Sequence, residues 1–160
     1  MVTKDGLLGN EGNPTYLDGW DPDRTVTDFA SKPVAAKDYV PLWLNRLAED
    51  ATLEGTMMNG AVRGANTIRT ILSFVRSLYE GQQVTFAGPF GEDGFLEVYN
   101  TRIRDHPIGS VVVVTRNLKG EAQHIAASYR PRSSALIASR ILGVHFSGTP
   151  IALYFNSRED

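Results

Sequence analysis

The sequence contains no cysteine and only three histidines among its 160 residues. The lack of cysteine excludes disulfide bonds, thiol catalysis and zinc sites built on cysteine. The histidines, His106, His124 and His145, stand far apart without the spacing of metal ligands. The short motifs of dinucleotide, nucleoside triphosphate, zinc protease and serine hydrolase sites are absent as well. We therefore expect neither a metal nor a cofactor.

An excess of charge of one sign is also lacking, since the formal net charge is -2 and the sequence pI is about 5.9. Such a chain has no basic region of the kind that binds nucleic acid or an anionic membrane. No apolar run approaches the roughly 20 residues of a spanning helix, and the first residues lack a signal-peptide pattern. We expect a soluble cytoplasmic protein without nucleic acid or membrane partners.

A chain of this length with 42% hydrophobic residues can form one domain with a buried core. Residues 1–23 hold several glycines and prolines and are interpreted as an irregular N-terminal arm. This arm is either disordered or docked on the body or a partner subunit through Tyr16, Leu17 and Trp20. Residues 24–160 are expected to form the single domain.

The clearest periodic pattern predicts a long amphipathic helix over residues 66–79. Asn66 is its expected N-cap, and Glu80 with Gly81 its expected end. A short strand over residues 52–58 is predicted before it, and two earlier helices over residues 25–36 and 38–49.

After residue 82 the periodicity becomes that of strands. Strands are predicted over residues 83–88, 95–104, 108–116 and 121–129, and a helix over residues 133–142. Short turns between consecutive strands imply antiparallel pairing. Residues 111–114 are apolar on both faces, so their strand should be central and covered on both sides. The helices provide one cover, and we expect a second subunit to provide the other.

The segment LAEDATLEG, followed by a turn and then by RGANTI at the start of a helix, resembles the SnoaL-like branch of the nuclear transport factor 2-like superfamily. This superfamily includes ketosteroid isomerases, polyketide cyclases, dehydratases and epoxide hydrolases, and the resemblance covers about residues 38–129. It implies an α+β cone-shaped fold, with about three N-terminal helices packed on a curved, mostly antiparallel sheet that encloses a pocket. Dimers are common in this family, which agrees with a homodimer formed through the outer sheet face.

The resemblance does not carry over the catalytic residues of these enzymes. The position of the ketosteroid isomerase base is held here by Gly55, and the position of its oxyanion-stabilising acid falls at about Val112. Its first-helix tyrosine falls near Phe29 or Ala30, and the acid on the last strand of the epoxide hydrolases corresponds to Ala127. The scaffold is therefore expected without the known proton-transfer groups.

The pocket itself is still expected. The alignment with strand alternation turns a mostly apolar set of side chains toward the interior. The predicted ligand-binding residues are Leu53, Met57, Leu72, Phe86, Phe90, Phe95, Val112, Ile125, Ala127 and Tyr129.

Glu97 is the first candidate for catalysis, with the Tyr99 hydroxyl as its partner. An inward Glu97 would have a pKa raised by burial, which suits general acid or base catalysis. Alternatively, Glu97 points outward or pairs with Arg63 or Arg102. His124 is the third candidate, although alternation places it on the outer face; only a register slip of one residue would turn it toward the pocket.

Three functions remain open. The chain could be a cofactor-free isomerase, cyclase or dehydratase that acts on a hydrophobic ring-bearing carbonyl compound. It could bind such a compound without catalysis. It could also be a dimeric interaction module whose interior is filled by side chains.

Overall fold

The computed structural model describes residues 40–155, which form a six-stranded sheet with two α-helices and two short 3-10 helices. In chain order the elements are η1 (Leu42–Asn45), β1 (Leu47–Gly55), β2 (Val62–Arg63), α2 (Ala65–Ser77), β3 (Glu80–Phe90), β4 (Gly94–Ile103), β5 (His106–Arg116), β6 (Ala122–Arg130), α3 (Arg132–His145) and η2 (Pro150–Tyr154). None of the helices in this range has the length and apolar character to cross a membrane.

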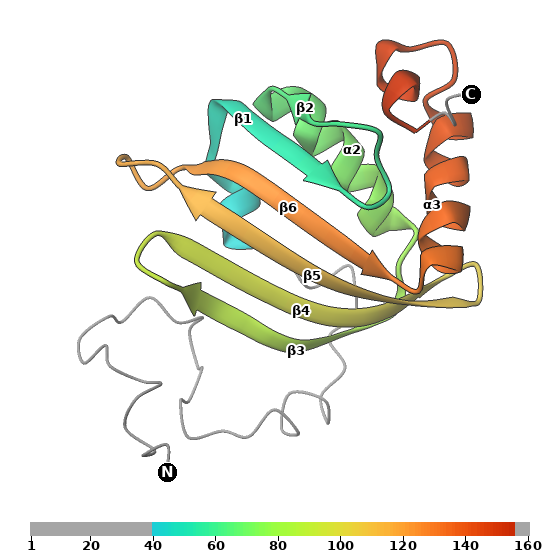
Figure 1. The fold of residues 1–160 in the computed structure, drawn as a ribbon, viewed down its shortest axis with the longest axis horizontal. Helices are drawn as coiled ribbons and strands as arrows, with labels where there is room; N and C mark the ends of the chain where they lie inside the picture. The colour runs from blue at the N-terminus through green and yellow to red at the C-terminus, as the bar shows by residue number, and fades with distance from the viewer. Residues whose placement is uncertain (1–39, 156–160) are drawn as a thin grey trace.

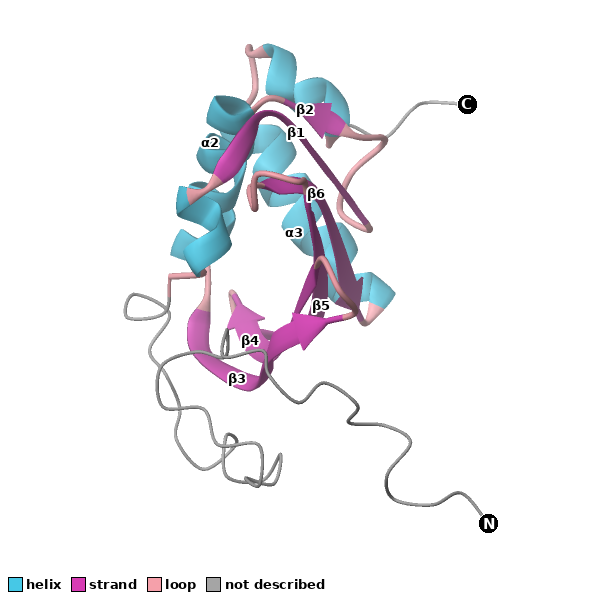
Figure 2. Cartoon of the chain, turned by 90° about the vertical axis from the view of Figure 1, so that its left-hand side faces the viewer, coloured by secondary structure: helices cyan, strands magenta, loops and turns pink. Residues whose placement is uncertain are grey.

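The strands lie in the order β2-β1-β6-β5-β4-β3. Strands β3 to β6 form an antiparallel meander, and β1 joins its far edge by pairing in parallel with β6. The sheet curls from β1 to β3, with α2 lying across its inner side (Figure 2). Helix α3 packs near the end of β6 (Figure 1). The expected α+β architecture with a curved, mostly antiparallel sheet is confirmed.

Helix α2 begins after Gly64, whose φ of 111° lies in a region that glycine adopts most readily. It buries Ile68, Ile71 and Val75 on one face, which packs mainly against β1. This is the face that the 3.6-residue periodicity predicts. The expected helix over residues 66–79 is therefore confirmed, although it begins at Ala65 and ends at Ser77.

The four predicted strands after residue 82 are all present, with bounds that differ from the predicted ones by at most a few residues. Strand β5 lies inside the sheet between β4 and β6. Its Val112 and Val114 are buried on the inner side, whereas Val111 and Val113 are only half-buried on the outer side. The predicted C-terminal helix is also present, as α3.

The predicted helix over residues 38–49 is wrong. Residues Leu42–Asn45 form a single 3-10 turn, and β1 begins at Leu47, which pairs with Ala122 of β6. The apolar spacing of this segment fits a helix, but pairing with β6 satisfies the backbone of its second half instead, and Leu42 is 68% exposed. The three N-terminal helices implied by the resemblance are not confirmed within residues 40–155. The arm over residues 1–23 and the predicted helix over residues 25–36 lie outside the described residues.

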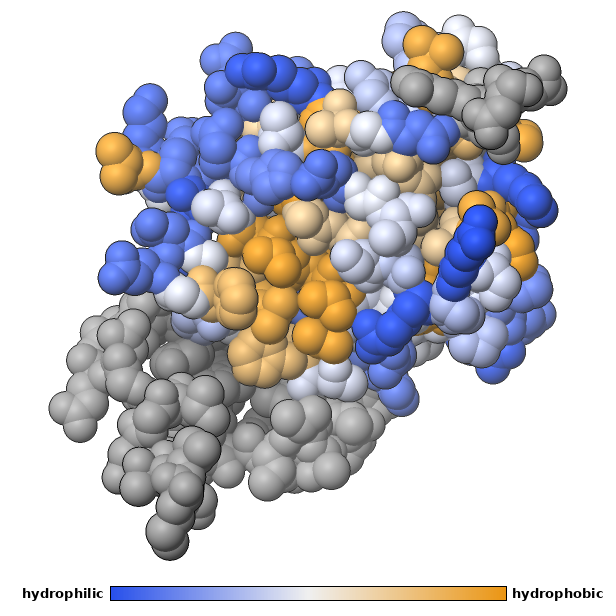
Figure 3. Space-filling model, in the orientation of Figure 1, coloured by the Kyte–Doolittle hydropathy of each residue, from blue (hydrophilic) through white to orange (hydrophobic). Residues whose placement is uncertain are grey.

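The outer face of the sheet, which points away from α2, carries a group of half-buried apolar side chains. Figure 3 shows a continuous apolar area on this side of the molecule. Strand pairing places the members of this apolar outer area beside one another: Phe86, Leu96, Val98, Val111, Val113 and Ala126.

Candidate functional site

A small cavity lies between α2, η1 and the inner face of the sheet. Its volume is about 30 Å³, which is room for about two water molecules. Six structural elements contribute to its lining, η1, α2, β3, β4, β5 and β6, together with Pro41 before η1 and Tyr79 between α2 and β3. The lining residues are Pro41, Trp43, Leu44, Leu72, Arg76, Tyr79, Gln82, Glu97, Tyr99, Val112, Ile125, Ala127 and Tyr129.

The carboxylate of Glu97 lies at this cavity and is shielded from solvent. Glu97 follows the inward alternation of β4 and is 2% exposed. The indole Nε1 of Trp43, on η1, donates a hydrogen bond to Glu97 Oε1 at 3.0 Å. Because hydrogen bonds to a carboxylate are stronger than neutral ones, this contact fixes both the orientation of Glu97 and the position of η1 over the cavity. Of the alternatives considered for Glu97, the outward orientation does not occur.

Three tyrosine hydroxyls meet on the same cavity wall. The Tyr79 hydroxyl lies 2.7 Å from that of Tyr99 and 3.4 Å from that of Tyr129. The rings of Tyr79 and Tyr99 pack at a centroid distance of 5.6 Å. Tyr79 comes directly after the last turn of α2, whereas Tyr99 and Tyr129 face inward from β4 and β6. The sheet and the helix end therefore build one phenol cluster.

These phenols stay protonated at physiological pH. Burial raises the pKa of both Tyr79 and Tyr99 well above the ordinary value, and burial also raises the pKa of Tyr129. The charge of Glu97 contributes to the increase for Tyr99 and Tyr129, which places the carboxylate near the cluster. The two hydrogen bonds among the three hydroxyls use two of their three protons. The third proton can be donated to the nearby Ser110 hydroxyl or to an oxygen in the cavity.

Most of the predicted pocket residues line the interior. Tyr99, Leu72, Val112, Ile125, Ala127 and Tyr129 line the cavity beside Glu97. A second cavity of about 20 Å³ shares Leu72, Ala127 and Tyr129 with the first and is lined by Leu53 and Met57 among others. The predicted set is therefore largely brought together, but around much less empty space than a ring-bearing molecule needs.

Three predicted aromatic residues do not line either cavity. A bulge in β3 between Val84 and Phe86 shifts the alternation by one residue, so Phe86 pairs with Val98 on the outer face and Ala87 takes the inner position. Phe90 lies at the β3–β4 turn and is 56% exposed. Phe95 packs at the edge of the core and does not reach either cavity.

His124 lies on the outer face, on the other side of the sheet from Glu97, because β6 keeps the register in which Ile125 points inward. Its ring contacts Thr52 Oγ1 through Nδ1 and Glu54 Oε1 through Nε2, the latter at 3.2 Å. The register slip that would turn His124 toward the pocket does not occur, so His124 is not part of the candidate site.

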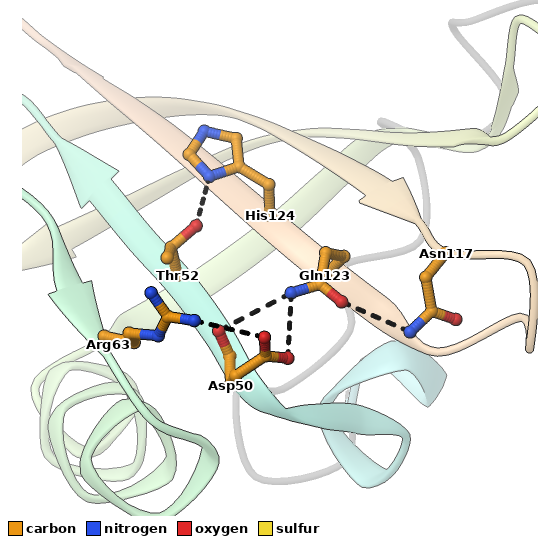
Figure 4. A network of polar contacts seen from close by, with 6 residues as sticks. All are labelled: Asp50, Thr52, Arg63, Asn117, Gln123 and His124. Carbon is orange, nitrogen blue, oxygen red and sulfur yellow. Dashed lines mark hydrogen bonds and ion pairs between the residues drawn. The ribbon is translucent and has the colours of Figure 1, made fainter.

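The polar contacts around His124 continue along the outer face of β1 and β6 (Figure 4). Asp50 accepts hydrogen bonds from Arg63 at 3.2 Å and from Gln123 at 3.1 Å, and Gln123 in turn accepts one from Asn117 at 3.2 Å. Arg63 is thus paired with Asp50 and not with Glu97. Among residues 40–155, no group of three histidine or acidic side chains is arranged to hold a metal ion.

The fold is similar to those of several solved structures. An uncharacterised protein with a cystatin-like fold from Silicibacter pomeroyi superposes with a TM-score of 0.61 and 15% identity, over 67% of this chain and 75% of the other. A steroid delta-isomerase from Pseudomonas aeruginosa superposes with a TM-score of 0.60 and 15% identity, over 65% and 77%. The chain therefore has a cystatin-like fold. No family model and no curated protein matches its sequence.

Two positions that the sequence resemblance assigns to catalytic acids lie at the cavity. Val112 and Ala127 do line the cavity, so the two acids expected there by resemblance are replaced by apolar side chains. At Gly55 a Cβ atom would lie 2.2 Å from the Ala127 carbonyl oxygen, so this backbone arrangement has no room for a side chain. The acid at this cavity instead comes from β4, as Glu97.

Sequence reasoning missed Trp43, Tyr79 and Gln82 as site residues. Trp43 was expected in a helix, and 54 residues separate it from Glu97, so no local pattern links the two. Tyr79 was interpreted as part of the apolar helix face. Gln82 lies one residue before the predicted strand, and its inward position could have been found by extending the alternation of Val84 backward.

Proposed function

We propose that the chain binds a small ring-bearing carbonyl compound at this cavity and transfers a proton on it without a cofactor. Glu97 is the base, and the phenol cluster of Tyr79, Tyr99 and Tyr129 is the hydrogen-bond donor to the carbonyl oxygen. The observation that supports this proposal is the buried carboxylate lining the same cavity as three protonated phenols.

The chemistry follows from these two groups. Glu97 takes a proton from the carbon beside the carbonyl, the C–H bonding electrons move into the new carbon–carbon double bond, and the carbonyl π electrons move to oxygen. A phenol stabilises that oxygen by its hydrogen bond, and Glu97 returns the proton to carbon. Isomerases, cyclases and dehydratases that act on carbonyl compounds share this first step.

Trp43 must move for such a ligand to enter. The empty volume holds only about two water molecules, and the indole of Trp43 lines the cavity with its N–H directed at Glu97. A ligand that displaces this indole gains its space and its hydrogen-bonding position at Glu97. The η1 turn that carries Trp43 also carries the buried Leu44, so the indole must leave the cavity while the turn itself stays in place.

The test is the exchange of carbon-bound protons in heavy water. 2-Tetralone, a fused-ring ketone with acidic protons beside its carbonyl, is incubated with the protein, and loss of its proton signals is followed by NMR. We expect the protein to accelerate exchange above the buffer rate. Glu97→Gln should remove the acceleration, and Tyr99→Phe should reduce it, since a positioned acid or base contributes about 10² to 10⁴ in rate.

Glu54→Gln is the matched control, because Glu54 lies on the outer face beside His124. It should exchange 2-tetralone as the wild type does. Binding without any acceleration, measured by thermal shift with the same ketone, would leave the non-catalytic binding function. If ketone and protein do not bind at all, the small-molecule proposal is wrong.

We also propose that two copies pair through the apolar outer area. Its six members cover the outer side of β3 to β6, where the described chain provides no helix. Burying such an area against an identical one removes apolar surface from water.

Sedimentation tests the dimer directly. The wild type should have about twice the 17.6 kDa chain mass. Val113→Lys, at the centre of the area, should shift it to the chain mass. Leu118→Lys is the control, since Leu118 is fully exposed in the β5–β6 turn. A monomeric wild type at micromolar concentration would contradict the proposal.

A further inference from the structure

The side-chain amide oxygen of Gln82 is buried at the same cavity without a hydrogen-bond partner in the described part of the chain. Gln82 is 2% exposed and lines the cavity with Glu97 and Tyr99. Its Oε1 atom is buried and accepts no hydrogen bond from any residue in the range 40–155. Burying an unpaired amide oxygen costs free energy that an apolar residue of the same size would not cost. The fold alone therefore does not account for glutamine at this position.

The polar groups of the cavity form a row along the inner side of β3 and β4. Tyr99 pairs with Val84, and Glu97 pairs with Ala87 two residues further along β4. Gln82 precedes Val84 by two residues on the same face. Since two strand residues span about 6.6 to 6.8 Å, the order along the cavity is Glu97, then the phenol cluster, then Gln82.

This order predicts where a ligand carries its hydrogen-bond acceptor, its hydrogen-bond donor and its proton-losing carbon. The phenol cluster provides a hydrogen-bond donor in the middle of the row, so it fits an acceptor such as a carbonyl oxygen. Gln82 Oε1 is an acceptor beyond it, so it fits a donor. Glu97, on the other side of the cluster, fits the carbon that loses its proton.

We propose that Gln82 selects ligands that carry a hydroxyl or amino group on the side of the carbonyl opposite to the proton-losing carbon. The substrate class is then a hydroxylated or aminated ring ketone. This inference rests on the proposed function, because it takes the same cavity as the ligand site.

Two pairs of ligands test the inference. The affinities of 2-tetralone and of 6-hydroxy- and 7-hydroxy-2-tetralone are measured by calorimetry for the wild type and for Gln82→Met. Relative to C3, one of the two carbons beside the carbonyl, the aromatic hydroxyls lie on the opposite side of the carbonyl, so the proton exchange of these ketones is followed at C3. A neutral hydrogen bond corresponds to a difference of about 2-fold to 13-fold in affinity. We expect the wild type to prefer at least one hydroxylated ketone by this factor, and Gln82→Met to bind parent and hydroxylated ketones equally.

The control is Gln83→Met, since Gln83 is the exposed neighbour of Gln82 and should keep the preference. Gln82→Leu repeats the test with a second apolar side chain. Both Gln82 variants should be at least as resistant to urea as the wild type. If both are clearly less resistant, the amide has a structural partner and the inference is wrong.

The outcomes separate this inference from the proposed function. Equal binding of parent and hydroxylated ketones by the wild type overturns the selection by Gln82, including the case in which a buried water satisfies the amide. Loss of binding for every ketone overturns the ligand site itself. A Gln82-dependent preference without proton exchange would support the inference and refute catalysis by Glu97.

Discussion

Gly55→Ala is the substitution that most directly tests the geometry of the inner sheet. Gly55 pairs with Ala127 across the parallel β1–β6 contact, and the Thr56 N–H donates to the Ala127 carbonyl at 3.2 Å. An added Cβ would lie 2.2 Å from that carbonyl oxygen, whereas real Cβ contacts essentially never fall below 3.0 Å. The strands must therefore separate by at least about 0.8 Å at this point.

The expected loss follows from this displacement. Overpacking of a well-packed contact costs about 1 to 3 kcal/mol, and weakening the Thr56 hydrogen bond adds about 1 kcal/mol. We expect Gly55→Ala to lose about 2 to 4 kcal/mol in the free energy of unfolding. For a chain of this size that corresponds to a decrease in Tm of about 5 to 15 °C.

Urea unfolding followed by far-ultraviolet circular dichroism measures this loss. Gly81→Ala is the control, because Gly81 has a φ of 62° but no atom near an added Cβ, so its loss should be about 1 kcal/mol. A Gly55→Ala variant within about 0.5 kcal/mol of the wild type would refute the reasoning. The position of the ketosteroid isomerase base would then have room for a side chain. Lack of space at Gly55 would no longer explain why the acid of this cavity is Glu97.

Three further predictions concern the cavity. Glu97→Gln should leave the free energy of unfolding near neutral pH unchanged or higher, because the amide oxygen still accepts from Trp43 and no charge is buried. A loss above about 2 kcal/mol in urea unfolding would instead indicate a structural charge pair. Trp43→Phe should lose about 1.5 to 3 kcal/mol in the same assay, as it removes the donor to the carboxylate, and this loss should shrink in the Glu97→Gln background. Because the pKa values of Tyr79 and Tyr99 are raised in the folded protein, the unfolded chain releases these phenol protons first as the pH increases. The free energy of unfolding should therefore fall above about pH 10, by up to about 1.4 kcal/mol per pH unit for each tyrosine. Tyr99→Phe should make this decrease shallower in urea midpoints measured from pH 8 to pH 11.

The sequence predicts well those parts of the fold that depend on local order. The face of α2 follows from 3.6-residue spacing, and the β3 to β6 meander follows from alternation and short turns. The inward orientation of Glu97 follows in the same way, since β4 keeps its alternation without interruption. These predictions needed no partner outside the element concerned.

The parts that failed depend on distant partners. The segment before Ala51 has apolar residues spaced for a helix, and only its pairing with β6, some 70 residues away, makes it a strand. Phe86 is turned outward by a bulge in β3, which the residue types of this segment do not predict. Trp43 completes the site through a hydrogen bond to Glu97, and neither residue indicates the other in the sequence.

The parallel pairing of β1 with β6 has a consequence for folding. The partners of β3, β4 and β5 are sequence neighbours, so the meander can form as soon as its own residues are available. Strand β1 is synthesised first among the described strands, yet its parallel partner β6 is synthesised last. Closing that long loop is entropically costly and should be the slow step. The cavity, whose roof is carried by η1 just before β1, is therefore completed only when β1 pairs with β6.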